Sequence, residues 1–315
     1  MTPLRKKEQT QTELTSLLGL AAITPQDDPF ASHLLHDKIQ EVQTRLQEIE
    51  EAPVSVQETE ILFGGGPVIV SEGIDTKFAA KILDSFQDMV TNEFAASHGL
   101  LRRAGRRKGE SDTRLFLTAL PRGSVGVQLA QPLVTDFVTA GNVAKAMEEV
   151  TILVEATAAS DEKFEDALVH FHPRVFKPLV RFFDTMALAN AECRMLTGMR
   201  DVRLQYEQII AGTSRASATT MTEKDVEEKG KFGGVLVTSR RFEFLSTTGN
   251  VISGWLAETV SDEDAEQMAS QTGHMSLVKM KETTILTRSG RKKPAYELIA
   301  LTPLEGDHEL AAPVE

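Results

Sequence analysis

Residues 232–257, FGGVLVTSRRFEFLSTTGNVISGWLA, decide the fold of the C-terminal part of this chain. Three short runs rich in β-branched and aromatic residues are separated by turn signals, of which Gly249–Asn250 is the clearest. An acidic, helix-like segment follows at 261–271, and two further strand-like runs lie at 276–287 and 295–301. The pattern therefore predicts three strands, a helix and two more strands.

This order of elements is the order found in the OB-fold, a small and partly open five-stranded barrel. We therefore predict that residues 231–304 form an OB-like, all-β barrel with five strands and one helix. Another small barrel, such as an SH3-like one, is the alternative that the pattern leaves open.

The residues before the barrel carry mixed signals of helix and strand. Apolar residues at steps of three and four predict amphipathic helices over 31–51 and 75–95. Strands are predicted near 54–63 and 67–71, on either side of a turn at Gly64–Gly66. Further on we expect a hairpin of 115–120 with 124–130, a short strand in AECRMLTG (191–198), and helices near 133–158 (broken around Gly141), 161–170, 173–190 and 201–210. Residues 31–211 are thus predicted to form an α+β domain.

Three segments are too polar to contribute to a core. We predict a flexible N-terminal lead at 1–30, a linker at 212–230 between the two domains, and an acidic tail at 305–315.

Composition limits the class of protein. The 315 residues carry a formal charge of −12 and include one cysteine, Cys193, which excludes a disulfide scaffold within the chain. No run approaches the roughly 20 apolar residues that cross a bilayer, so we expect no membrane association. The first residues lack the apolar core of a signal peptide, and a cytoplasmic protein is the simplest expectation.

The sequence carries none of the familiar catalytic motifs. The glycines at 64–66 run into Pro67 and another β-type run, whereas a phosphate loop needs Gly-Lys-Ser/Thr leading into a helix. There is no Gly-x-Ser-x-Gly elbow and no HExxH, and His172–Pro173 is expected to start a helix rather than to bind a metal. We therefore expect no metal and no cofactor, and we lean toward a protein that is not an enzyme.

Positive charge gathers in three places despite the negative total. These clusters are candidate sites for anions or nucleic acid, because they fall in predicted loops and not along a helix where neighbouring acids would pair with them. They are Arg102, Arg103, Arg106, Arg107 and Lys108 before the hairpin, Arg240 and Arg241 between the first two barrel strands, and Arg288, Arg291, Lys292 and Lys293 between the last two. The two barrel loops correspond to those that hold oligonucleotides in OB-folds.

Aromatic residues lie beside the cations of the barrel. Phe242 and Phe244 alternate on the second strand, and Trp255, the only tryptophan, lies on the third. Such side chains stack on the bases of single-stranded nucleic acids. They are also what a small barrel needs for its core, and the sequence leaves both interpretations open.

Two stretches resemble uncharacterised bacterial proteins. In residues 62–90 a glycine-flanked apolar strand leads to a helix with the pair Phe86–Gln87, and in residues 115–129 Arg-Gly-Ser precedes a glycine. The resemblance covers about half of the chain, and it implies no activity and no site residues.

These observations favour a non-enzymatic binding or assembly protein that self-associates as a homo-oligomer and presents its barrel to a protein partner. The amphipathic helix at 31–51 and the charged loops of the barrel motivate this hypothesis. One alternative is a binder of single-stranded nucleic acid that uses the basic loops. The other is an enzyme with a site near the hairpin bend, where Arg114, Arg122 and Ser124 could hold an anionic ligand.

Overall fold

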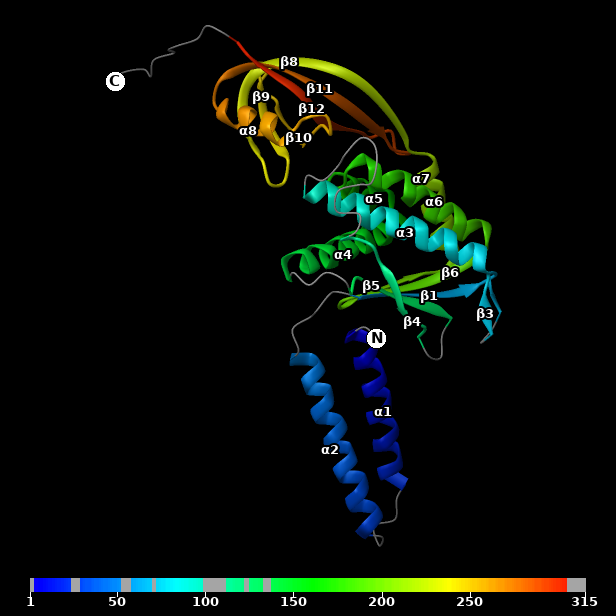
Figure 1. Cartoon of the computed structure of the whole chain (residues 1–315). Coiled ribbons are helices and arrows are strands. Elements are labelled where there is room, and N and C mark those ends of the chain that lie inside the picture. The colour runs from blue at the N-terminus through cyan, green and yellow to red at the C-terminus, as the bar shows by residue number, and fades with distance from the viewer. Residues whose placement is uncertain are drawn as a thin grey trace.

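The computed structural model describes residues 3–23, 29–51, 58–69, 72–98, 112–121, 125–132 and 137–304. A two-helix hairpin stands at one end of the molecule, followed by a five-stranded sheet, a layer of helices, and a five-stranded barrel at the opposite end (Figure 1). The chain is thus a mixed helix-and-sheet protein.

The hairpin consists of α1 (Pro3–Ile23) and α2 (Pro29–Glu51). α2 is the amphipathic helix predicted over 31–51, and its Val42 is fully buried. The prediction of a flexible lead at 1–30 is wrong for the described residues, because α1 is a helix of 21 residues. Its sequence is polar but includes apolar residues that pack on α2, and ion pairs such as Lys7–Glu50 (2.9 Å) join the two helices.

The sheet is antiparallel throughout, with the strand order β4-β5-β1-β6-β7. Alternate residues of β1, β5, β6 and β7, such as Ile61 and Phe63 of β1, enter the main core. A separate two-stranded hairpin follows the first strand. The strands are β1 (Glu58–Gly65), β2 (Val68–Ile69), β3 (Gly73–Ile74), β4 (Phe116–Ala119), β5 (Gly126–Ala130), β6 (Ala191–Thr197) and β7 (Arg200–Leu204).

The close approach of two backbone segments explains why glycine occupies positions 65 and 66. Gly65 has a φ of +79°, and a Cβ there would lie 2.3 Å from the carbonyl oxygen of Asn190. Two backbones therefore meet where β1 ends, and a side chain at this position would separate them. The turn lies at Gly66–Pro67, one to two residues later than predicted, and Gly64 and Gly65 are the last residues of β1.

Helices cover one face of the sheet, and the hairpin extends from the other side (Figure 1). The helices are α3 (Thr76–Ser97), α4 (Phe137–Ala159), α5 (Asp161–Leu168), the short 3₁₀ helix η1 (Pro173–Val175), α6 (Phe176–Leu188) and α7 (Tyr206–Ser217). α4 is unbroken at Gly141, which faces open space. The predicted helix over 201–210 is wrong in its first half, because residues 200–204 form the edge strand β7.

The barrel closes in the order β10-β12-β11-β8-β9. The five strands enclose a second hydrophobic core, which includes Phe232, Val278 and Leu298, all fully buried. β10 and β12 run parallel, whereas the other neighbours are antiparallel. The elements are β8 (Thr220–Leu236), β9 (Arg241–Ser246), β10 (Val251–Leu256), α8 (Asp262–Ser270), β11 (Met275–Leu286) and β12 (Lys292–Pro303).

The predicted linker at 212–230 is instead the end of α7 and most of the long strand β8. Its polar residues face solvent on a strand that pairs with β11 over twelve positions, from Thr220–Leu286 to Lys231–Met275. Ile285 of β11 belongs to the main core, and Met221 of β8 packs against it. Strand pairing, which composition does not reveal, therefore joins the barrel to the helices without a flexible segment. The tail at 305–315 lies outside the described residues.

Candidate functional site

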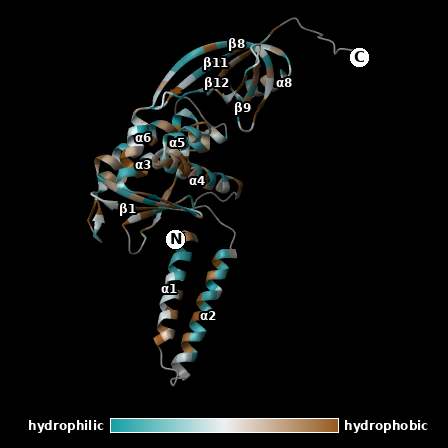
Figure 2. Ribbon diagram, turned by 180° about the vertical axis from the view of Figure 1, so that it is seen from behind, coloured by the Kyte–Doolittle hydropathy of each residue, from teal (hydrophilic) through white to brown (hydrophobic). Residues whose placement is uncertain are grey.

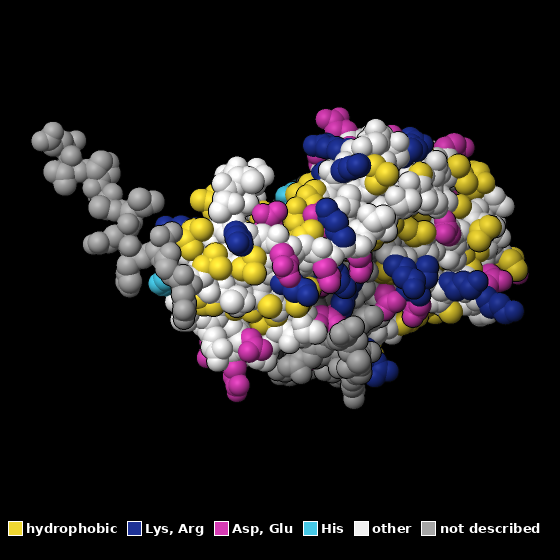
Figure 3. Space-filling model, turned by 90° about the horizontal axis from the view of Figure 1, so that it is seen from above, with side chains coloured by type: hydrophobic (Ala, Val, Ile, Leu, Met, Phe, Trp, Pro, Cys, Tyr) yellow, Lys and Arg dark blue, Asp and Glu magenta, His cyan; other side chains and the backbone are white. Residues whose placement is uncertain are grey.

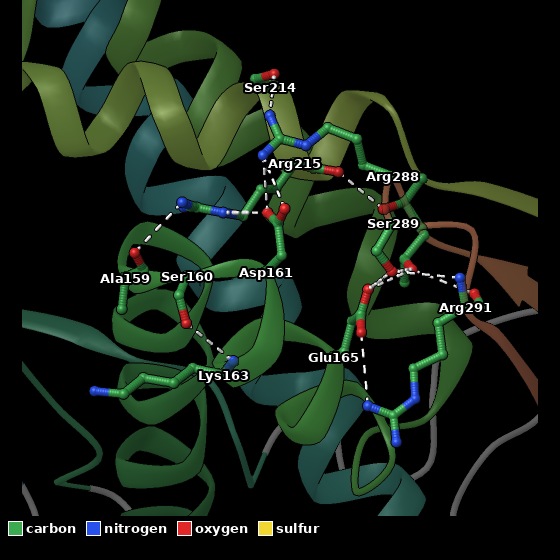
Figure 4. A network of polar contacts seen from close by, with 12 residues as sticks. Ala159, Ser160, Asp161, Lys163, Glu165, Ser214, Arg215, Arg288, Ser289 and Arg291 are labelled. Atoms are coloured by element: carbon green, nitrogen blue, oxygen red, sulfur yellow. Dashed lines mark hydrogen bonds and ion pairs between the residues drawn. The ribbon is translucent and has the colours of Figure 1, made fainter.

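The basic turn between β11 and β12 is docked on the acidic helix α5 (Figure 4). Arg288 donates to both carboxylate oxygens of Asp161, at 3.1 and 2.9 Å. Arg215 of α7 donates to the same carboxylate at 2.7 Å and to carbonyls in the last turn of α4, including that of Thr157 at 2.8 Å. One aspartate thus joins the barrel to two helices, and the hydrogen bond from Arg288 leads the contacts that lower the pKa of Asp161.

The other residues of the turn contact a second carboxylate on α5, that of Glu165. The hydroxyls of Thr287 (2.6 Å) and Ser289 donate to it, and Arg291 forms an ion pair with it at 3.6 Å. Lys293 donates to the main-chain carbonyl of Glu165. Hydrogen bonds from Ser289 and then Thr287 hold the pKa of Glu165 below its usual range.

Three of the four cations predicted to form a nucleic-acid loop are therefore engaged within the chain. Lys292 is exposed. A phosphate backbone would have to displace Arg288 and Arg291 from their carboxylates, so binding at this loop stays a prediction. On the face seen in Figure 3, basic and acidic side chains are interspersed and form no continuous field of one sign.

Arg240 is also used internally. Its guanidinium is buried, with hydrogen bonds to Asp262 at 2.9 Å and to the carbonyls of Ala257 and Val260. Arg240 therefore fastens the turn before α8 and is not positioned to receive a ligand, contrary to the prediction. The prediction that Arg240 lies in a loop is correct, but in the folded protein its side chain is buried.

The stacking role predicted for Phe242 and Phe244 is wrong. Each is 1% exposed and belongs to the barrel core, because alternation on β9 turns both rings inward. Trp255 points outward on β10, yet it is 5% exposed. The body of the protein covers it, so none of the three rings is available to a base in this structure.

Trp255 lies between two side chains at the contact of barrel and body. The guanidinium of Arg241 lies 4.2 Å from the centre of the indole, and the ring of His172 packs edge-on at 4.9 Å. Arg241 and Trp255 face each other across β9 and β10, whereas His172 precedes η1 in the body. The indole of Trp255 therefore packs against a residue of the barrel and a residue of the body.

The imidazole of His172 is buried between two polar groups. Nδ1 accepts a hydrogen bond from the main-chain N–H of Arg174 (3.2 Å), which caps η1 as the sequence predicted, and Nε2 lies 3.1 Å from Glu297 of β12. Because Nδ1 is an acceptor, the neutral ring carries its proton on Nε2, which is buried beside the carboxylate but makes no hydrogen bond among the described residues. Burial lowers the pKa of His172. Arg174 and Glu258 form a further ion pair across the same contact.

Glu93 of α3 is the most perturbed carboxyl group of this region. Burial raises its pKa to about 7, although Ser97 donates a hydrogen bond to it at 2.9 Å. Its second oxygen, Oε2, is buried and has no hydrogen-bond partner in the described part of the chain. The charges that act on it are Arg241 of the barrel and Glu149 and Lys145 of α4. Glu93 and Arg241 thus face each other from the body and from the barrel.

Sequence reasoning missed the acidic half of this region. Asp161, Glu165 and Glu93 lie in helices of a chain that is acidic throughout, so nothing in the local pattern distinguishes them. The clustered arginines were a usable signal, since a basic turn needs an acidic partner somewhere, but the sequence does not say that the partner is α5.

The remaining predicted site residues contribute little to a described site. Arg102, Arg103, Arg106, Arg107 and Lys108 lie outside the described residues, as do Arg122 and Ser124. Arg114 is exposed and lies 5.5 Å from the ring of Phe116.

Other chemistries have little support in the described ranges. No three His, Cys, Asp or Glu side chains there come together as a metal site requires. Cys193 is buried in the core, and burial raises the pKa of its thiol to about 12. None of the helices described has the length and apolar character needed to cross a membrane.

Comparison with protein-family models, with curated proteins and with solved structures found no match. Function is therefore argued from the residues of this chain.

Proposed function

We propose that this chain is a non-enzymatic, cytoplasmic assembly protein that self-associates through the α1–α2 hairpin and presents an OB-like barrel to a protein partner. One observation carries the proposal: the hairpin extends away from the body (Figure 1), its helices carry hydrophobic residues among hydrophilic ones (Figure 2), and large apolar side chains in it are exposed. Leu18 is 49% exposed, Ile23 78% and Leu34 64%.

The hairpin cannot form a substantial core by itself. Each of its two helices covers one side of the other, and in the described parts of both helices Val42 is the one large apolar residue that is fully buried. Two such hairpins side by side would bury the remaining apolar faces as a four-helix bundle, which is a common way to complete a pair of helices. A second copy of this chain is therefore the occupant that we propose.

Charge supports the same occupant. α1 has three basic and two acidic residues, a net of +1, and α2 has two basic and five acidic residues, a net of −3. A two-fold axis would place α1 of one copy beside α2 of the other, so helices of opposite sign become neighbours. Salt bridges at the base, including Arg5–Glu60 at 3.1 Å, join the hairpin to the sheet and leave its far end exposed.

The topology of the barrel supports an OB-like assignment. Its first three strands are consecutive neighbours, the third runs parallel to the fifth, and a helix lies between the third and fourth. The barrel lies at the end of the molecule opposite to the hairpin (Figure 1), so association through the hairpin would leave it accessible to a partner.

The test is the mass of the particle in solution, measured by light scattering after size exclusion over a range of concentrations. We expect the wild-type chain to be at least a dimer, and we expect Leu18→Glu combined with Leu34→Glu to be a monomer with unchanged circular dichroism. Leu188→Glu, at an exposed apolar residue of α6, is the matched control and should leave the mass unchanged. A monomeric wild type, or a double variant that stays associated, would refute self-association through the hairpin.

A further inference from the structure

Arg241 differs from the other arginines at the contact of barrel and body. Arg240, Arg288 and Arg291 each meet a carboxylate. The guanidinium of Arg241 makes no hydrogen bond or ion pair with any residue that the structure describes, although it is half-buried and burial lowers its pKa. A cation removed from water without a hydrogen-bonded counter-charge is costly, so its place in the fold needs a reason.

The guanidinium is held in a fixed place. It lies 4.2 Å from the centre of the Trp255 ring, and that ring is itself held by His172 on the body. An arginine stacked on an aromatic ring keeps the edges of its planar fork for hydrogen bonding, and little rotational freedom remains to be lost when a ligand binds.

A second donor beside Arg241 also lacks a partner. The indole Nε1 of Trp255 is buried and has no acceptor among the described residues. Buried N–H groups in proteins are nearly always hydrogen-bonded, so an acceptor is expected here. The charge of Glu93 acts on Arg241, but Glu93 makes no hydrogen bond to Arg241, and its own pKa is raised to about 7.

Arg241 also lines a cavity of ≈ 610 Å³ on the outside of β8, β9 and β10. Glu243 and Ser253 contribute to its wall, together with Gly233 and Gly254. The volume lies within the range of small-molecule sites. A carboxylate in the wall disfavours a polyanion and offers an acceptor to a hydroxyl or amino group.

We propose that Arg241 and this cavity bind a small organic oxyanion, a carboxylate or a phosphate monoester, with two of its oxygens on the guanidinium. The rest of the ligand lies along β9 and β10 and donates a hydrogen bond to Glu243. A bidentate oxyanion supplies the geometry that the guanidinium fork prefers, together with the charge that the site lacks. This site is independent of the hairpin and of self-association.

Trp255 makes the proposal directly measurable, because it is the only tryptophan of the chain and stacks on Arg241. Its fluorescence is recorded while inorganic phosphate or succinate is added at constant ionic strength. We expect a saturable change with a dissociation constant of about 1–20 mM, as suits two charge-assisted hydrogen bonds without the rest of the ligand. Saturation by phosphate alone identifies the phosphate source, and saturation by succinate alone the carboxylate source.

Two substitutions at the site and one control complete the test. Arg241→Gln should weaken the binding by about tenfold or more, and Glu243→Gln should leave it unchanged or strengthen it. Arg181→Gln, at an exposed arginine paired with Asp88, is the control and should bind as the wild type does. The proposal is overturned if neither anion gives a saturable change, if sodium chloride gives the same change, or if folded Arg241→Gln binds as tightly as the wild type.

Discussion

The hairpin and the barrel use their charged residues in opposite ways. In the barrel, basic residues of the β11–β12 turn reach carboxylates on the body, where Glu165 and Thr287 are buried and the side chains of Arg288 and Arg291 are about half exposed. In the hairpin, charged residues such as Arg45 and Glu13 pair at the surface, 3.2 Å apart, while apolar residues are left exposed. The part of the chain that looked like a ligand-binding surface is therefore a structural joint, and the part that looked unstructured offers the larger unfilled apolar surface.

The largest expected effect sharpens the account of the barrel. Phe244→Ala should lower the free energy of unfolding by about 3–5 kcal/mol, because Phe244 fills the barrel core. Leu245→Ala, one residue along and half-exposed, should change it by less than about 0.5 kcal/mol. Urea unfolding followed by Trp255 fluorescence measures both. Equal, small effects would mean that Phe244 is not in the core and would restore its predicted stacking role.

A smaller effect compares an arginine of the body helix α7 with an arginine of the hairpin. Arg215→Ala should cost about 2–4 kcal/mol of unfolding free energy, since it leaves carbonyls at the end of α4 and part of Asp161 without donors. Arg45→Ala removes an exposed pair on the hairpin and should cost about 0–1 kcal/mol. Thermal unfolding of the two variants in the same buffer decides the matter. Similar costs would show that the contacts of Arg215 with α4 and α5 stabilise the fold no more than an ion pair on the hairpin surface does.

The smallest effect depends on pH and concerns Glu93. Burial raises its folded-state pKa to about 7 from an ordinary value of 4.5, so the folded protein binds this proton more tightly than the unfolded chain does. The stabilisation is complete below pH 4.5 and is lost as the pH rises to about 7. The wild type should therefore lose about 1–3 kcal/mol of unfolding free energy through this group between pH 5 and pH 8.

Glu93→Gln should remove that loss, because the amide cannot ionise. Glu72→Gln, at an exposed carboxyl group, is the control and should keep the pH profile of the wild type. Unfolding free energies at pH 5, 6, 7 and 8 provide the measurement. A variant profile that falls as steeply as that of the wild type would show that Glu93 is already ionised in the folded protein.

Local pattern predicted most of the elements. The helices over 31–51 and 75–95 and the order of the barrel elements are confirmed, because the spacing of apolar residues depends on which local structure buries them. The errors fall where a distant partner decides. α1 becomes a helix against α2, residues 220–230 become a strand against β11, and residues 200–204 become a strand against β6.

Sequence by itself determined which residues are basic, which runs are apolar and in which order strands and helices follow one another. Tertiary structure decided which group each charged side chain contacts. Arg288 binds Asp161, which is 127 positions away in the sequence, and Glu165 accepts a hydrogen bond from Thr287. Arg241 stacks on the ring of Trp255 and binds no carboxylate among the described residues. The physical reason is the separation in sequence over which each interaction acts. Hydrophobic periodicity acts over a few neighbouring residues, whereas an ion pair or a shifted pKa depends on burial and on partners that come together only when the chain is folded.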